Sequence, residues 1–281
     1  MPAVHIREVL RSARADRRGV AAFNVITLEH AEAIVAGAEA AGRPVILQLS
    51  ENAVRFHGGA LAPIAAAMAA VAQGAAVPAA LHLDHVEDPA LLRAAATAGF
   101  SSVMFDASCA ADEDNVAATH DAATWAHGNG LWLEGELGAV GGKDGVHAPG
   151  PGTDPAAAAV YVARTGVDTL AVAVGSSHKM TERSARLDHG RIAALRESVD
   201  VPLVLHGSSG VPEDELERAV AAGICKVNVG TLLNVAMTGA VRAALAADPD
   251  LVDPRPYLAA GRDAMAAAAE RTARALAGPG A

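Results

Sequence analysis

The chain has 281 residues, and its 22 basic and 32 acidic residues give a formal net charge of −10. This acidic balance argues against a nucleic-acid or anionic-membrane partner, because both need clustered positive charge, although local donors can still bind a phosphorylated substrate. Two cysteines are too few for a disulfide framework and favour a reducing, cytoplasmic compartment. The alanine-rich runs lack the roughly 18–20 strongly apolar residues of a membrane span.

Short apolar segments alternate with alanine-rich stretches along the whole chain. Eight segments predict buried β-strands, at residues 20–25, 44–50, 78–84, 102–107, 131–138, 169–177, 202–207 and 225–231. Helices are expected after them, at residues 29–41, 63–73, 89–98, 113–126, 155–164, 189–198, 212–222 and 232–246. The first residues predict an extra N-terminal helix, and residues 254–277 predict a C-terminal helical extension.

Eight strand–helix units in about 250 residues predict an α/β fold of the (β/α)8 TIM-barrel type. No linker or charge block divides the chain, so we expect a single domain over residues 1–281. An open doubly wound sheet is the rival architecture, and the lack of a GxGxxG motif after the first strand disfavours it.

Polar side chains gather where the predicted strands end, and in a barrel this rim carries the chemistry. The strand ends supply Asn24, Ser50, Asp84, His85, Asp106, Glu134, Glu136, His178, His206 and Asn228. A buried charged cluster must be paired or bound to metal. Any one histidine could be an ordinary hydrogen-bonded rim residue, but His85, His178 and His206 together match a catalytic Zn²⁺ site that keeps one position open.

Two short loops at the ends of the last strands predict phosphate binding. They contain Gly207, Ser208 and Ser209 after the seventh strand, and Asn228, Val229, Gly230 and Thr231 at the eighth. Barrels often bind phosphate between these loops through backbone N–H groups and helix N-termini. Plain turns also use glycine and a capping residue, so the prediction depends on having both loops in adjacent units.

The segment after the fifth strand is long, rich in glycine and proline, and carries Lys143, Asp144 and His147. Loops of this length in compact barrels often form lids. Asp144 is therefore a candidate mobile acid or base, with a solvated loop charge as the alternative.

Taken in series, these residues resemble the class II, zinc-dependent fructose-bisphosphate and tagatose-bisphosphate aldolase family. The matching segments keep the family's order and read AFNV, LHLDH, VMFDAS, EGELGAVGG, GSSH, PLVLHGSSGVP, KVNVGT and DPRPYLAAGRDAM. The resemblance implies reversible cleavage of fructose-1,6- or tagatose-1,6-bisphosphate to dihydroxyacetone phosphate and glyceraldehyde 3-phosphate, through an enediolate that Zn²⁺ stabilises. It also implies a homo-oligomer, either a dimer or a tetramer.

The resemblance implies roles for individual residues. Zn²⁺ would be held by His85, His178 and His206, with Asp106 and Glu136 beside it or holding a second ion. Asp84 would be the catalytic acid and base, and Asp144 would move the C1 proton. The expected substrate-binding set is Asn24, Ser50, Lys179, Gly207, Ser208, Ser209, Asn228, Val229, Gly230, Thr231 and, for the distal phosphate, Arg262.

The chain departs from the family pattern at Lys179, where the family has a glycine that offers its backbone to phosphate and often to a monovalent cation. The lysine ammonium could bind phosphate instead. In the lid, Lys143 and Asp144 replace a pair of acidic residues. The substrate preference is therefore open, and another phosphorylated keto-sugar or keto-sugar acid is the alternative.

Three other functions compete with metal-dependent aldol chemistry. A Schiff-base aldolase would need a buried, activated lysine at a strand end. Lys179 is the candidate, because Lys226 lies low in the eighth strand. A non-catalytic sugar-phosphate-binding barrel is the second alternative. A metal-dependent hydrolase is the third, although Asn24 stands where such barrels commonly begin an HxH motif.

Overall fold

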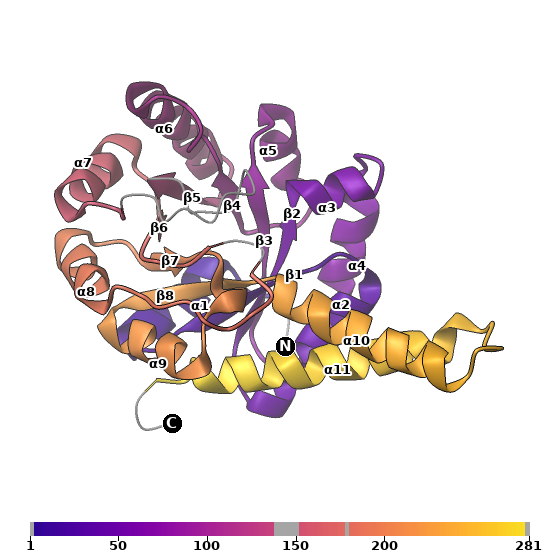
Figure 1. Cartoon of the computed structure of the whole chain (residues 1–281). Helices are drawn as coiled ribbons and strands as arrows, with labels where there is room; N and C mark the ends of the chain where they lie inside the picture. The colour runs from indigo at the N-terminus through magenta and orange to yellow at the C-terminus, as the bar shows by residue number, and fades with distance from the viewer. Residues whose placement is uncertain (1–2, 138–151, 178–179, 279–281) are drawn as a thin grey trace.

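The computed structural model describes residues 3–137, 152–177 and 180–278, and it shows a closed barrel of eight parallel strands (Figure 1). The strands are β1 (Val20–Asn24), β2 (Val45–Ser50), β3 (Ala79–Val86), β4 (Ser102–Phe105), β5 (Trp132–Leu137), β6 (Thr169–Val172), β7 (Leu203–Leu205) and β8 (Ile224–Val229). Each strand pairs with the next one, and β8 closes the barrel on β1. The predicted TIM barrel is confirmed.

Helices surround the barrel, and each strand is followed by at least one of them. They are α1 (Ile6–Ala15), α2 (Leu28–Ala41), α3 (Glu51–Phe56), α4 (Leu61–Gly74), α5 (Pro89–Ala95), α6 (Asp112–Gly128), α7 (Pro155–Thr165), α8 (His189–Ser198), α9 (Glu213–Ala222), α10 (Thr231–Ala247) and α11 (Pro254–Ala275). The expected N-terminal helix and C-terminal extension are present as α1 and α11. The short helix α3 and the 3-10 turn η1 (Ser208–Gly210) were not predicted. No helix within the described ranges is both long enough and apolar enough to cross a membrane.

Three helices begin with the same aspartate–proline pair. Asp88, Asp154 and Asp253 are the N-caps of α5, α7 and α11, and each side chain accepts a hydrogen bond from a backbone N–H of the first turn. Proline follows each cap, where its fixed φ suits the helix and its missing N–H is not needed. These local signals explain why the starts of these three helices were predicted correctly.

Two hydrophobic clusters stabilise the barrel. The larger one lies between the outer face of the sheet and the surrounding helices. In the smaller one, Ile6, Val9 and Leu10 of α1 pack against Val20 and Cys225 at the start of the strands. Apolar side chains of α1 thus cover the N-terminal end of the barrel interior, and Asp84, His85 and His206 lie at the opposite end.

The sixth and seventh strands are shorter than predicted. Sheet pairing of β6 ends at Val172 and that of β7 at Leu205, so the residues that follow belong to rim loops. Polar contacts hold these loops together, since Ser176 Oγ donates a hydrogen bond to the carbonyl of His206 at 2.6 Å. The loop geometry therefore places His206 at the rim.

Candidate active site

A bulge in β3 turns two consecutive side chains toward one space. The pairing of β3 with β4 shifts its register between Leu83 and Val86, and within this stretch His85 has a left-handed backbone with φ of 49°. Adjacent residues of a regular strand point to opposite faces, whereas a bulge re-aims a side chain. Asp84 and His85 consequently reach the same site. A non-glycine residue in this conformation costs free energy and typically marks a functional position.

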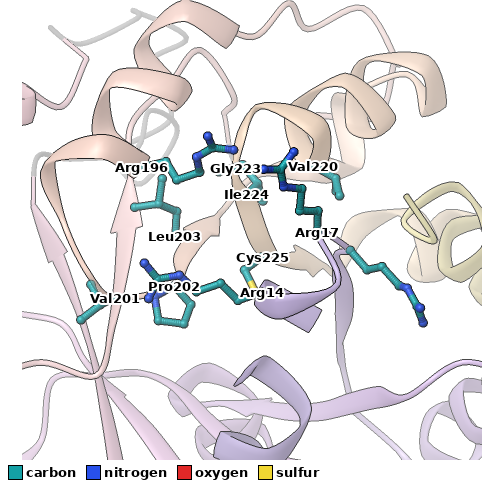
Figure 2. Close-up of a pocket in the computed structure, with 11 residues that line it drawn as sticks. Arg14, Arg17, Arg196, Val201, Pro202, Leu203, Val220, Gly223, Ile224 and Cys225 are labelled. Carbon is teal, nitrogen blue, oxygen red and sulfur yellow. The ribbon is translucent and has the colours of Figure 1, made fainter. Parts of the chain in front are cut away.

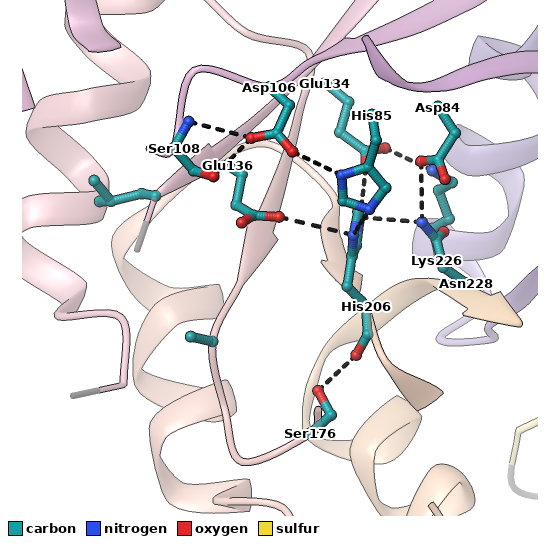
Figure 3. A network of polar contacts seen from close by, with 12 residues as sticks. Asp84, His85, Asp106, Ser108, Glu134, Glu136, Ser176, His206, Lys226 and Asn228 are labelled. Atoms are coloured by element: carbon teal, nitrogen blue, oxygen red, sulfur yellow. Dashed lines mark hydrogen bonds and ion pairs between the residues drawn. The ribbon is translucent and has the colours of Figure 1, made fainter. Parts of the chain in front are cut away.

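One nitrogen of His85 is fixed by a carboxylate. His85 Nδ1 lies 2.8 Å from Asp106 Oδ2. The second oxygen of Asp106 accepts hydrogen bonds from Ser108 N–H at 3.2 Å and from Ser108 Oγ at 2.6 Å. With Nδ1 held in this way, His85 Nε2 faces His206 (Figure 3).

His206 has the mirror arrangement at the end of β7. Its Nε2 lies 3.0 Å from Glu134 Oε1 and 3.0 Å from the amide nitrogen of Asn228. Its Nδ1 points to the other side, where Glu136 Oε2 lies 3.8 Å away. The His206 side chain is fully buried, so these polar groups replace the water that it loses.

In each imidazole, one nitrogen contacts a carboxylate, Asp106 or Glu134, and the other nitrogen faces the second imidazole. His85 Nε2 and His206 Nδ1 are 3.1 Å apart, and the ring planes are 87° to one another. Two nitrogens bound tetrahedrally to one Zn²⁺ at about 2.0–2.1 Å lie about 3.3–3.4 Å apart. A carboxylate behind each imidazole is the usual outer arrangement of a metal-bound histidine. The residues present therefore fit a shared metal ion.

The charges of the site favour a cation. Burial lowers the pKa of His85, but the charge of Asp84 and the hydrogen bond to Asp106 outweigh it and raise the pKa to about 9. Burial raises the pKa of Asp84, but the charges of His85 and His206 outweigh it and lower the pKa. Asp84, His85 and His206 each offer a ligand atom, and these atoms lie within 4.8 Å of one another.

A cavity of about 450 Å³ opens beside these groups. Its lining includes Asp84, His85, Asp106, Asn24, Ser50, Gly207, Ser209, Asn228, Gly230 and Thr231. The two predicted phosphate loops are tied together, because Ser208 Oγ donates a hydrogen bond to the carbonyl of Asn228. Ser209 Oγ also accepts a hydrogen bond from the N–H of Leu232 in the first turn of α10 at 3.2 Å. Both loops thus border the cavity that holds Asp84 and His85.

The chain matches a known protein family over nearly its whole length. The family model described as "Fructose-bisphosphate aldolase class-II" matches residues 4–280. The chain belongs to this aldolase family. It is 39% identical over 271 residues to the fructose-bisphosphate aldolase of Geobacillus stearothermophilus, with 95% of this chain and 94% of the relative covered.

Two further relatives of this aldolase bear on its chemistry. One is the 6-phospho-5-dehydro-2-deoxy-D-gluconate aldolase of Shouchella clausii, 36% identical over 271 residues, with 95% of this chain and 92% of the relative covered. The other is the crystal structure of the YdjI aldolase from Escherichia coli K12, with a TM-score of 0.84 and 31% identity over 98% of this chain and 97% of that chain. This membership makes the chain a class II aldolase, a carbon–carbon lyase. It argues against a Schiff-base enzyme, a hydrolase or a non-catalytic barrel.

The two carboxylates expected beside the metal lie on different sides of the imidazoles. Asp106 contacts the outer nitrogen of His85, so it orients the ring. Glu136 faces the inner nitrogen of His206. Of this pair, Glu136 is placed to approach a bound ion directly, while Asp106 acts through His85.

Several expected site residues are not brought to the cavity. Arg262, on α11, pairs with Glu32 of α2 at 3.0 Å and does not line the cavity within the described chain. Val229 is buried in β8, so only its backbone could face a ligand. Three residues lie outside the described ranges: Asp144, His178 and Lys179.

Two polar residues inside the barrel, Gln48 and Lys226, complete the site, and their roles in it were not predicted from the sequence. Gln48 Nε2 donates hydrogen bonds to Asn24 Oδ1 at 2.8 Å and to Asp84 Oδ2 at 3.3 Å. Lys226 Nζ donates to Glu134 Oε2 at 2.8 Å. The sequence did contain a signal for both residues, because each is polar and stands at an inward position of an otherwise apolar strand. Lys226 is two residues from Asn228 and therefore lies on the same face of β8.

Proposed function

We propose that this aldolase binds one Zn²⁺ through His85 Nε2 and His206 Nδ1, with His178 as the third histidine. We propose that the metal-bound enzyme cleaves fructose-1,6- or tagatose-1,6-bisphosphate to dihydroxyacetone phosphate and glyceraldehyde 3-phosphate. The observation that supports this most directly is the pair of inner nitrogens 3.1 Å apart, each ring backed by a carboxylate. When bound, the metal supplies a Lewis acid for the substrate ketone.

Asp84 is placed to move the proton of the C4 hydroxyl. Its carboxylate lines the cavity next to His85, and its lowered pKa keeps it ionised as a base in the cleavage direction. In the synthetic direction the same group returns the proton. Gln48 and Asn228 each donate a hydrogen bond to it, at 3.3 and 3.4 Å, so its oxygens are oriented before substrate arrives.

The substrate phosphate is assigned to the loops that follow β7 and β8. Gly207, Ser209, Gly230 and Thr231 line the cavity there, and α10 begins at Thr231. Backbone N–H groups at the start of a helix bind anions well. Asn24 and Ser50 border the same cavity, and Ser50 is also the N-cap of α3, since its Oγ accepts a hydrogen bond from the N–H of Ala53.

A second substrate class is kept as the alternative. The Shouchella clausii relative is named an aldolase of a phosphorylated keto-sugar acid, and its identity to this chain is close to that of the fructose-bisphosphate aldolases. A keto-sugar acid shares the ketone and one phosphate but not the second phosphate. Both substrates would use His85, His206 and Asp84 in the same way.

We propose a homo-oligomer in which a second copy covers α10. This helix of 17 residues is largely apolar, yet Leu233 is its one buried residue, while Val235 and Leu245 are exposed. Together with α11 it extends away from the barrel (Figure 1). Light scattering should give a dimer or tetramer, and Val235→Asp should dissociate it.

We also propose a cytoplasmic location. The two free cysteines, Cys109 and Cys225, support it, because a reducing compartment keeps thiols unpaired.

A panel assay tests the proposed substrate. The zinc-loaded enzyme is offered fructose-1,6-bisphosphate, tagatose-1,6-bisphosphate and a phosphorylated 5-dehydro-2-deoxy-gluconate, and kcat/KM is compared. We expect one of the bisphosphates to give the highest value and EDTA to abolish it. A higher kcat/KM for the sugar acid would favour the alternative substrate class. Cleavage activity that survives complete metal removal would contradict the proposed zinc-dependent reaction.

A further inference from the structure

A second cavity, of about 230 Å³, lies at the N-terminal end of the barrel, where β7 and β8 begin (Figure 2). Four arginines line it: Arg14, Arg17, Arg18 and Arg196. We propose that this cavity binds a small oxyanion of the phosphate class, at a site separate from the one that carries out the reaction.

The charge in this cavity is only partly neutralised by protein groups. Arg14 Nη2 lies 3.9 Å from Asp200 Oδ1, and Arg18 Nη2 lies 3.5 Å from Asp16 Oδ2. Arg17 and Arg196 have no carboxylate within ion-pair distance in the described part of the chain. Guanidinium groups stay charged at physiological pH, so their mutual repulsion favours a bound anion.

The backbone at the cavity packs against the stem of one of the arginines. Gly223 has φ of 141°, and a Cβ at this position would lie 2.7 Å from Cδ of Arg196. The stem of Arg196 therefore lies directly against Gly223, which no larger residue would allow. Arg17 follows the C-cap of α1 with φ of 53°, and the N–H of Arg18 donates to the carbonyl of Ala13, so this left-handed turn ends the helix and places Arg17 beside the cavity. Because its stem is packed in this way, Arg196 loses less conformational freedom when a ligand binds.

A simpler explanation accounts for part of the positive charge. Helices α1 and α8 end at this face, and basic residues in a last turn complement the helix dipole. Arg93 does the same in the last turn of α5, and it does not line this cavity. A dipole effect calls for one exposed cation at each helix end. It does not explain why four guanidinium groups line one cavity, or why Gly223 lies against the stem of Arg196.

The size of the cavity selects the ligand. A volume of 230 Å³ is half that of the cavity beside Asp84, which measures 450 Å³. Pockets for drug-sized ligands measure about 300–1,000 Å³. The polar lining consists chiefly of guanidinium groups, which recognise phosphate oxygens in a bidentate fashion. A single phosphate group therefore fits better than a whole sugar bisphosphate.

Residue-level protection from phenylglyoxal, which modifies arginine side chains, tests this proposal on the full-length, metal-loaded protein. Inorganic phosphate is the probe, and peptide mass spectrometry measures the rate at each arginine. We expect phosphate to slow modification of Arg17 and Arg196 at least fivefold while leaving Arg93 unchanged. Arg55 lines the cavity beside Asp84, so its protection separately reports binding there.

Two variants distinguish a specific phosphate site from a general effect of positive charge. In Arg17→Ala/Arg196→Ala, calorimetry should show the dissociation constant of this phosphate site rising at least tenfold, while the ketose-bisphosphate cleavage rate stays at the wild-type value. The matched control Arg93→Ala should bind phosphate like the wild type. Equal protection of Arg17, Arg196 and Arg93, or unchanged phosphate binding in the double variant, would overturn the proposal and reduce the cluster to helix-end charge.

Discussion

Lys226 Nζ donates a hydrogen bond to Glu134 Oε2 at 2.8 Å, and both side chains are buried inside the barrel (Figure 3). Burial raises the pKa of Glu134, but the charge of Lys226 and the hydrogen bond with His206 outweigh it and hold the pKa well below its usual value. The ionised Glu134 accepts a hydrogen bond from the N–H at His206 Nε2, which leaves His206 Nδ1 unprotonated and able to bind metal. A buried ion pair thus sets the tautomer of His206, the proposed metal ligand.

Replacing the buried lysine should damage both the fold and the metal site. In Lys226→Met the Glu134 carboxylate loses its counter-charge, and a broken buried ion pair costs about 3–5 kcal/mol. Urea unfolding measures this loss, and zinc content should fall as well. In the double variant Lys226→Met/Glu134→Leu the stability should largely return while zinc binding stays weak. A single variant as stable as the wild type would contradict this account of the pair.

Asp106→Ala should weaken metal binding without unfolding the protein. Asp106 holds the outer nitrogen of His85, and loss of such a partner typically costs 10–100-fold in metal affinity. Competition with a chelating dye measures the zinc dissociation constant. The control Asp112→Ala removes an exposed carboxylate from the first turn of α6 and should leave the constant unchanged. Identical zinc affinity in both variants would show that Asp106 does not orient His85.

Glu215 should make stability depend on pH. The hydrogen bond from Arg186 outweighs the effect of burial and, with the contact from His189, lowers the pKa of Glu215 to about 2. Because the folded pKa lies below the unfolded one, this stabilisation is complete above about pH 4.5 and is lost as the pH falls toward 2. Glu215→Gln should therefore lower the urea midpoint at pH 7, with a smaller difference at pH 3. A difference that is independent of pH would argue against the ionised pair.

The barrel could be predicted from the sequence because each unit carries its own signals. Apolar strands, alanine-rich helices and the proline starts at residues 89, 155 and 254 are local features, and the structure reproduces them. Ser50 is the last residue of β2, as predicted, but its side chain also caps the turn that follows, and the short helix α3 that begins there was missed.

The site could be predicted only in part. Strand ends identified His85, His206 and Asp84 correctly as neighbours, because parallel strands converge at one rim. The two roles of Asp106 and Glu136 could not be separated, since they depend on which side of each imidazole a carboxylate reaches. Arg262 was assigned to the distal phosphate from the resemblance alone, and in this chain it pairs with Glu32.

The most direct test of the central claim is zinc content measured together with ketose-bisphosphate cleavage in Asp84→Ala. In the proposed site Asp84 transfers the proton, and the zinc is held by nitrogens of His85 and His206. The account predicts one zinc per chain, as in the wild type, with cleavage reduced by at least about 10²–10⁴-fold. Loss of zinc from this variant, or cleavage at the wild-type rate with zinc bound, would contradict the role given to Asp84.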